Sequence, residues 1–408
     1  MSLSLRSANL QVSTITFEET NAELSYATHG MFRYFGKLPP SVLRYLIVQG
    51  LKIAPGHSPF VDLMVGSGTS LVEAMLLGVP NIGIDVNPLS AMISKAKTTI
   101  IDPSELSACL DELMRGLARN EAPVGQLRLP FSPCQPRDPG FPNLSAHSSE
   151  DALPAIRNLD YWFLPEVQAQ LLRLRGAVRR LPRPEVRNFF LATFASCIRR
   201  CSNASPRVGR IFHIDHKETP DVYQIFFRKT VAAIEGIAQL ARTAKTRRVE
   251  VIEADARATG LPANSVPMAH MHPPYFALYR YSSDVLRFEM AWLGLDRRAT
   301  ASKEIREGFK TTDRSEYYSY LDDLEAVLRE AFRILLPGGV ISVVVNNSTF
   351  RDERLPVVED LIGRGENLGF IIHELQQRAV LYQQASYHRS AREDKRTDSD
   401  YIIFARKP

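Results

Sequence analysis

Residues Phe60 to Asn87 read FVDLMVGSGTSLVEAMLLGVPNIGIDVN, and this stretch decides the fold. A short apolar run ends at Asp62, a Gly-Ser-Gly-Thr turn follows, and Ser70 to Leu77 carries apolar residues at helical spacing. A second apolar run, Ile82 to Ile84, ends at Asp85. The order predicts a strand, a tight turn, a helix and a second strand, with an acidic residue at the carboxyl end of each strand.

The turn has the features of a nucleoside-binding loop. Gly66 and Gly68 tolerate positive φ and let a ligand approach the backbone without a β-carbon in the way. Asp85 follows at about the distance, roughly 20 residues, at which a doubly wound sheet places the carboxylate that binds ribose hydroxyls. A nucleoside cofactor is therefore favoured over the alternative, a purely structural strand-helix-strand unit.

The same residues resemble a known family. DLMVGSGTSLVEAMLLG and IGIDVNPLSAMISKAKTT look like the S-adenosylmethionine motif of the DNA amino-methyltransferases, which methylate the exocyclic amine of cytosine or adenine. THGMFRYFGKLPP upstream, HPPY at 272–275 and LLPGGVISVVV near the end extend the resemblance over most of the chain outside a middle segment. Two differences stand out: Leu63 and Met64 replace the usual Pro-Phe, and His272 replaces Ser, Asp or Asn.

The pattern of elements agrees with the fold that this family implies. Strands and helices alternate before residue 101 and after residue 217, which predicts an α/β fold with a mostly parallel sheet and helices on both faces. The resemblance implies a Rossmann-like class I methyltransferase sheet with an antiparallel last strand, for which Tyr401 to Phe404 is the candidate. We expect an N-terminal arm (1–20), a catalytic core (21–100 and 218–408), and a mostly helical insertion (101–217) that serves as a DNA-recognition region.

The resemblance implies that the cofactor is S-adenosyl-L-methionine. Asp85 would hold the ribose hydroxyls, Asp255 would accept the adenine amine, and Asp62 would face the methionine end or order the glycine loop. The aromatic and basic segment Tyr26 to Pro40 would pack around the methionine end; the alternative is a buried helix without ligand contact. The full predicted cofactor set is Asp62, Gly66, Ser67, Gly68, Thr69, Asp85, Asn87 and Asp255.

The motif HPPY supplies the predicted catalytic residues His272, Pro273, Pro274 and Tyr275. An exocyclic amine is a poor nucleophile because its lone pair is delocalised, so an enzyme must accept hydrogen bonds from it. The Pro273 carbonyl and a neutral His272 are candidate acceptors, and Tyr275 is a candidate platform for the base. An ordinary histidine pKa of about 6.5 predicts a rate that rises through roughly pH 6 to 7. The alternative is a simple proline turn after a strand.

A base inside a duplex cannot reach such a pocket, so this hypothesis requires DNA with a flipped target base. Wedge and clamp residues are expected in Phe276 to Ser315 and in the arginine-rich insertion. The resemblance favours cytosine N4 slightly over adenine N6. Rival hypotheses are an RNA base methyltransferase and a catalytically inactive nucleic-acid-binding protein on a methyltransferase scaffold, for which Leu63, Met64 and His272 are the evidence.

The positive charge of the chain is unevenly distributed. The formal net charge is only +5, yet Leu171 to Arg210 holds ten arginines against a single acid, Glu185. Arginine's planar fork matches phosphate oxygens, which favours nucleic-acid contact over the alternative, a solvated basic helix face. The residues predicted to contact nucleic acid are Arg199, Arg200, Arg207 and Arg210.

Composition limits the remaining choices. The 408 residues are 45% apolar and 23% charged, as in an ordinary globular protein, and no apolar run approaches the roughly 18 residues of a membrane span. The start, MSLSLRSANL, lacks the apolar core of a signal peptide, and four cysteines fit a reducing cytosol. We therefore expect a cytoplasmic protein with no membrane partner. The resemblance implies nucleoid DNA as the substrate and a cognate restriction or defence-system protein as a candidate partner.

Two further motifs carry less weight. Prolines recur every third residue from Pro130 to Pro142, which favours a stiff polyproline II surface loop over a partner-recognition motif. Cys197 and Cys201 precede His213 and His216, but the spacing matches no strong zinc motif, so no metal is predicted.

Overall fold

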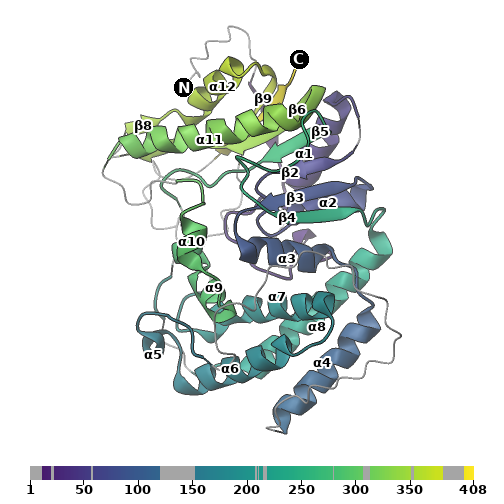
Figure 1. The fold of residues 1–408 in the computed structure, drawn as a ribbon, viewed down its shortest axis with the longest axis vertical. Coiled ribbons are helices and arrows are strands. Elements are labelled where there is room, and N and C mark those ends of the chain that lie inside the picture. The colour runs from purple at the N-terminus through teal and green to yellow at the C-terminus, as the bar shows by residue number, and fades with distance from the viewer. Residues whose placement is uncertain are drawn as a thin grey trace.

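The computed structural model describes residues 12–19, 23–56, 58–119, 152–206, 209, 211–214, 218–278, 280–306, 313–350, 353–379 and 399–408. Arg207, Arg210, His216 and the proline repeat lie outside the described residues, as does most of the predicted arm. The described part forms a twisted sheet with helices against it and a separate group of helices beside it (Figure 1).

The sheet has eight strands in the order β1-β9-β10-β6-β5-β2-β3-β4. All neighbouring pairs are parallel except those of β10, which runs antiparallel to both β6 and β9. The expected α/β class and the antiparallel last strand are confirmed. The strands are β1 (Val12–Thr16), β2 (Phe60–Asp62), β3 (Asn81–Asp85), β4 (Val249–Glu253), β5 (Val266–Met271), β6 (Leu335–Val345), β9 (Ile371–Ala379) and β10 (Ser399–Arg406), with a small hairpin of β7 (Ser348–Phe350) and β8 (Glu353–Leu355).

Helices cover both faces of the sheet, because neighbouring residues of a strand point to opposite sides. Phe60 of β2 packs against α1 (Pro40–Ile53) and α2 (Thr69–Leu77) on one side. Val61, the next residue, belongs to the cluster formed with α11 (Ser315–Ile334) and α12 (Val357–Asn367) on the other. The expectation of helices on both faces is therefore confirmed.

The remaining helices form a body below the sheet in Figure 1. They are α3 (Pro88–Thr98), α4 (Pro103–Ala118), α5 (Leu159–Trp162), α6 (Pro165–Arg179), α7 (Pro184–Cys201), α8 (Val222–Thr243), α9 (Arg287–Leu293) and α10 (Arg297–Ala301). Residues of α3, α4 and α6 to α9 share one hydrophobic cluster. The division at residues 101 and 217 remains a prediction, and the helical body also includes α8 and α9, which follow residue 217 in the chain.

Several helices begin where the sequence signals a start. Proline occupies the first position of α1, α3, α4, α6 and α7, where its missing N–H costs nothing. Asn87 and Asp102 cap α3 and α4 by accepting hydrogen bonds from the backbone N–H groups of Leu89 and Ser104. The cap at Asn87 places the start of α3 directly beside the end of β3.

The segment that precedes α1 is hydrogen-bonded to α8 near Ala27. The backbone N–H of Ala27 donates to Gln239 Oε1 at 2.7 Å. A β-carbon placed on Gly236 would lie 2.4 Å from the carbonyl oxygen of Ala27, closer than the two atoms can approach. A glycine at this position therefore lets the segment reach its place over the sheet.

We predict that Gly236→Ala destabilises the protein by about 1–3 kcal/mol, because the new methyl group must push the segment off α8. Gly363→Ala is the matched control, since a β-carbon at this glycine of α12 meets nothing within 4 Å. That substitution should be neutral or stabilising by up to about 1 kcal/mol. Urea unfolding of both variants measures the difference, and equal stabilities would contradict the contact.

Candidate active site

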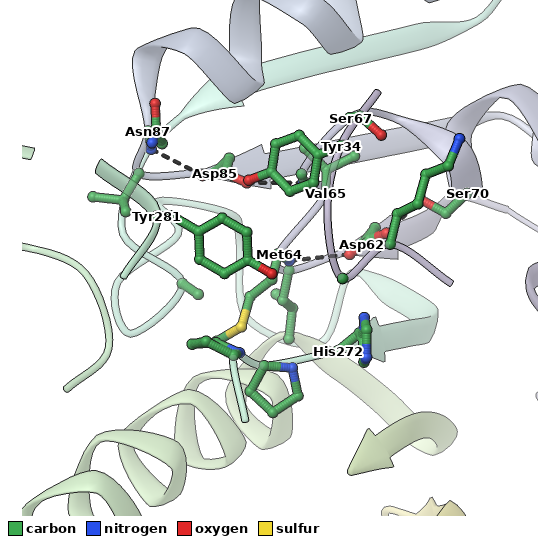
Figure 2. Close-up of a pocket in the computed structure, with 18 of the residues that line it drawn as sticks. Tyr34, Asp62, Met64, Val65, Ser67, Ser70, Asp85, Asn87, His272 and Tyr281 are labelled. Carbon is green, nitrogen blue, oxygen red and sulfur yellow. Dashed lines mark hydrogen bonds between the residues drawn. The ribbon is translucent and has the colours of Figure 1, made fainter. Parts of the chain in front are cut away.

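Two carboxylates at the ends of neighbouring strands hold the glycine loop. Asp62, at the end of β2, accepts hydrogen bonds from the Met64 N–H at 3.0 Å and from the Ser70 hydroxyl. Asp85, at the end of β3, accepts from the Gly66 N–H at 2.8 Å and from the Asn87 N–H at 2.9 Å (Figure 2). The loop is therefore fixed at its start, its middle and its exit, and Asp62 has one of its two expected roles, ordering the loop.

The glycines have the backbone conformations that the sequence predicts. Gly66 has φ +53° and Gly68 has φ +72°, both in the left-handed region. A β-carbon on Gly68 would lie 2.9 Å from the Ser94 hydroxyl oxygen, so this glycine also allows α2 and α3 to pack closely. Gly68 itself does not line the pocket beside the loop.

One pocket collects most of the predicted site residues. It opens at the carboxyl ends of β2, β3 and β5, the edge at which open parallel sheets bind ligands. Tyr275 and Gly68 are the members of the predicted catalytic and cofactor sets that do not line it. Those that do are Asp62, Gly66, Ser67, Thr69, Asp85, Asn87, Asp255, His272, Pro273 and Pro274.

Some polar groups of the pocket have unused hydrogen-bonding capacity within the part of the chain that the structure describes. The side-chain hydroxyls of Ser67 and Thr69 are buried and have no hydrogen-bond partner among the described residues. Burial raises the pKa of Asp85 to about 7, although the Asn87 and Gly66 N–H groups partly oppose the effect. A carboxylate offers about four lone-pair sites and two are used here, so Asp85 can accept two more hydrogen bonds.

Asp255 lies at the same edge of the sheet and forms an ion pair with Arg257. Its two carboxylate oxygens accept from the Arg257 guanidinium at 2.7–3.1 Å, and Arg257 also bonds Asp323. The backbone N–H of Arg257 also donates to Oδ1 of Asp255 at 2.9 Å, and the residue lines the pocket. This is the position at which the resemblance expects a residue that accepts an adenine amine.

Several pocket residues were not predicted as site residues. Tyr34 and Tyr281 stack with their ring centroids 5.5 Å apart, and the Tyr281 hydroxyl donates to the Phe35 carbonyl at 3.2 Å (Figure 2). The aromatic composition of 26–40 was a signal for Tyr34, since this segment was expected to surround the cofactor. The same segment includes Gly36, Lys37 and Leu38, and the motif stretch 60–87 includes Leu63, Met64, Val65, Ser70 and Val86. No local pattern marks the others, which are Leu43, Ala256, His270, Lys303, Glu304 and Ile305.

The HPPY turn presents its acceptors to this pocket. The Pro274 carbonyl accepts from the hydroxyl of buried Tyr320 at 3.0 Å, whereas the Pro273 carbonyl has no partner among the described residues. Tyr275 departs from its predicted role. Its ring packs edge-on to His272 at 5.5 Å and its hydroxyl points to Asp400, so it is not a platform within the pocket.

The expected titration of His272 near neutral pH is wrong. Burial, with smaller contributions from the nearby His270 and Arg378, lowers the pKa of His272 to about 3. The imidazole is therefore neutral throughout the physiological range and always keeps one acceptor nitrogen. The pH-dependent loss of that acceptor, expected from an ordinary histidine, does not apply.

The predicted phosphate contacts are partly wrong. Arg199 is buried, donates to the carbonyls of Gly209 and Val285, and lies 3.9 Å from Glu289. Arg175, in the same basic block, is buried against the carbonyls of Trp292 and Ala152. These guanidiniums serve the interior of the helical body and cannot reach a duplex. Arg200, by contrast, is exposed.

Other expectations concern metals and membranes. Cys109, Cys197 and Cys201 are buried free thiols. Among the described residues, no group of three or more His, Cys, Asp or Glu side chains is arranged to hold a metal ion. In the described part of the chain, no helix has the length and apolar character needed to cross a membrane.

The sheet with its antiparallel β10, the glycine loop between β2 and α2, and the acids that end β2 and β3 define a class I methyltransferase fold. No family model matches the chain. Its sequence is 26% identical over 213 residues to the Type II methyltransferase M.MvaI of Kocuria varians, covering 51% of this chain and 43% of that protein. It is 30% identical over 86 residues to the Type II methyltransferase M.MjaII of Methanocaldococcus jannaschii, covering 21% and 16%.

The chain is also similar to a solved Thermus thermophilus structure, described as a putative DNA modification methylase complexed with S-adenosyl-L-methionine. The identity is 25%, the match covers 38% of this chain and 54% of that chain, and the TM-score is 0.25. The curated relatives confirm the resemblance to the S-adenosylmethionine-dependent DNA methylase family. The chain spans less than half the length of the curated relatives it matches.

We predict that His272 stays neutral from pH 5 to 8. Burial disfavours the imidazolium, so its ring signals in the NMR spectrum of histidine-labelled protein should not shift over this range. The variant His272→Gln identifies those signals by their loss. A titration midpoint near 6.5 would show instead that the ring is solvated.

Proposed function

We propose that this chain transfers a methyl group from S-adenosyl-L-methionine to an exocyclic amine of a base in DNA. The observation that carries the proposal is that the HPPY turn and the acid-held glycine loop line one pocket, although more than 180 residues separate them in the sequence. A nucleoside cofactor and a target amine can therefore meet there. Cytosine N4 is the preferred target over adenine N6, on the resemblance of the motifs.

The residues of the pocket fit the proposed cofactor. Asp85 can take the ribose hydroxyls with its remaining lone pairs, and the partnerless hydroxyls of Ser67 and Thr69 can bond a polar ligand. Asp255 can accept an adenine amine. When bound, the cofactor would supply an electrophilic methyl group on a sulfonium, which needs no metal.

The HPPY turn would act on the target amine of the base. The Pro273 carbonyl and one nitrogen of His272 can accept the two N–H bonds of the amine, which draws its lone pair out of conjugation and towards the methyl group. The transfer would form one N–C bond and break one C–S bond, and the proton that the amine nitrogen loses would pass to solvent water. The target base would be flipped out of the duplex to reach this position.

A cationic surface next to the pocket suits the DNA backbone. Exposed Arg33 precedes the pocket residue Tyr34 and lies over the Phe35 ring at 5.0 Å. Burial lowers the pKa of Arg33, and Arg200 and Arg199 lower it further, which indicates that these cations lie close together. Arg200 is therefore a proposed phosphate contact, and Arg207 and Arg210 stay predicted contacts that lie outside the described residues. The helical insertion of 101–217 is the proposed recognition region.

We expect S-adenosylmethionine to bind more weakly at pH 6 than at pH 8. With its pKa raised to about 7, Asp85 is mostly protonated at pH 6 and loses acceptor capacity for the ribose. If only the ionised form binds, the affinity falls about tenfold over this range. Asp85→Asn should bind about tenfold more weakly at pH 8 and lack this component of the pH dependence.

Calorimetric titration of both proteins measures the effect. Glu253→Gln is the matched control, because this carboxylate ends the neighbouring strand β4 but does not line the pocket. It should bind as the wild type does at each pH. Parallel pH profiles for the wild type and Asp85→Asn would remove Asp85 from the ribose site.

The proposed activity is tested by incubating the protein with methyl-labelled S-adenosylmethionine and unmethylated duplex DNA of mixed sequence. Mass spectrometry of the digested nucleosides should show N4-methylcytosine, and His272→Ala should lower its rate by about 10²-fold. N6-methyladenine would correct the target base, and labelled RNA in a parallel reaction would correct the substrate. Cofactor binding without product in either polymer would select the inactive binding protein.

A further inference from the structure

A chain of hydrogen bonds leads from the pocket to the last two strands of the sheet. His272 Nε2 lies 3.3 Å from the Tyr275 hydroxyl, which lies 3.3 Å from Asp400 Oδ2. Arg378 binds Asp400 with two nitrogens: Nε donates to Oδ1 at 2.7 Å, and Nη2 donates to Oδ2. Asp400 of β10 and Arg378 of β9 are direct partners across the strands, and both are buried.

The chemistry of these groups decides the direction of each hydrogen bond. A guanidinium is always charged and can only donate, and a carboxylate paired with it on both oxygens stays ionised and can only accept. The Tyr275 hydroxyl therefore donates its one proton to Asp400. Its oxygen is then left to accept a proton from His272 Nε2.

The tautomer of His272 follows from this order. A neutral imidazole carries one N–H, and here the hydroxyl of Tyr275 requires it on Nε2. Nδ1 then has a bare lone pair. No hydrogen-bond partner of Nδ1 is present among the described residues, and His272 borders the pocket near Asp62 (Figure 2).

We propose that the Arg378–Asp400 pair, acting through Tyr275, holds His272 in the Nε2–H tautomer so that Nδ1 accepts a hydrogen bond from the target amine. Tyr275, Asp400 and Arg378 are positioning residues in this scheme. The role of Nδ1 towards an amine rests on the proposed function, whereas the tautomer does not.

The proposal explains how a histidine can stand where the resembling family has Ser, Asp or Asn. An aspartate, asparagine or serine side chain brings an acceptor oxygen whatever its neighbours do. A neutral histidine left alone populates both tautomers, and in one of them the nitrogen facing the amine is a donor that repels it. The buried network removes that tautomer.

Two substitutions disturb the network in different ways. Tyr275→Phe removes the hydroxyl but keeps the ring, so Nε2 loses its partner and both tautomers become populated. Asp400→Asn places a donor beside the Tyr275 oxygen. The hydroxyl proton then turns to His272 Nε2, and the N–H of His272 moves to Nδ1.

The tautomer can be read directly from long-range ¹H–¹⁵N NMR correlations of histidine-labelled protein, with His272→Gln to assign the signals. We expect the Nε2–H pattern in the wild type, mixed tautomers in Tyr275→Phe and the Nδ1–H pattern in Asp400→Asn. Tyr317→Phe is the matched control, because it removes a tyrosine hydroxyl bonded to Asp360 at 2.6 Å, away from the pocket. It should leave the His272 pattern unchanged.

Kinetics then separate positioning from a structural role. Tyr275→Phe should lower kcat by about tenfold or more while the affinity for S-adenosylmethionine stays within about twofold of the wild type. Tyr317→Phe should change neither. An unfolded Asp400→Asn variant leaves the comparison of the two Tyr→Phe variants decisive.

The outcomes also distinguish this inference from the proposed function. An Nδ1–H tautomer in the wild type, or an unchanged His272 pattern in Tyr275→Phe, would overturn the inference even if methyl transfer is observed. A wild-type Nε2–H pattern that Tyr275→Phe disrupts supports the network even if no nucleic acid is methylated, and then only the proposed function fails.

Discussion

The site depends on two carboxylates that accept backbone N–H groups at the ends of adjacent parallel strands. Asp62 and Asp85 hold the glycine loop from opposite sides, at the Met64 and Gly66 N–H groups. Removing either acceptor would leave a partly buried N–H unpaired, at a cost of up to about 1–3 kcal/mol. The loop therefore has a fixed shape before any ligand arrives, and binding does not have to pay for ordering it.

The same carboxylates set the electrostatics of the pocket. Burial would keep Asp85 neutral if the two N–H groups of Gly66 and Asn87 did not favour its charge, and the balance raises its pKa to about 7. His272, at the far side of the pocket, is kept neutral by burial with its pKa lowered to about 3. One edge of the pocket can carry negative charge while the other offers a neutral acceptor, which suits a cationic cofactor beside an uncharged amine.

The sequence predicts those parts of the molecule whose structure is local. The β2-α2-β3 unit, its glycines and its two strand-end acids all lie within 28 residues, so periodicity and turn chemistry were enough to place them. The residues that were missed come from far along the chain. Glu304 and Tyr281 reach the pocket from a segment about 200 residues further on, and no local pattern marks residues brought together only by tertiary packing.

The arginine block and Tyr275 show why composition and motif can mislead about role. Arg199 was expected at the surface because its stretch is basic, but its guanidinium satisfies carbonyls that would otherwise be buried without a donor. Tyr275 was expected to stack on a base, but its hydroxyl donates to Asp400, which forms an ion pair with Arg378 between β9 and β10. In both cases a buried polar partner determines where the side chain points, and no local sequence pattern identifies that partner. The ion pair that orients Tyr275 of the HPPY turn thus comes from β9 and β10, far along the chain from the glycine motif.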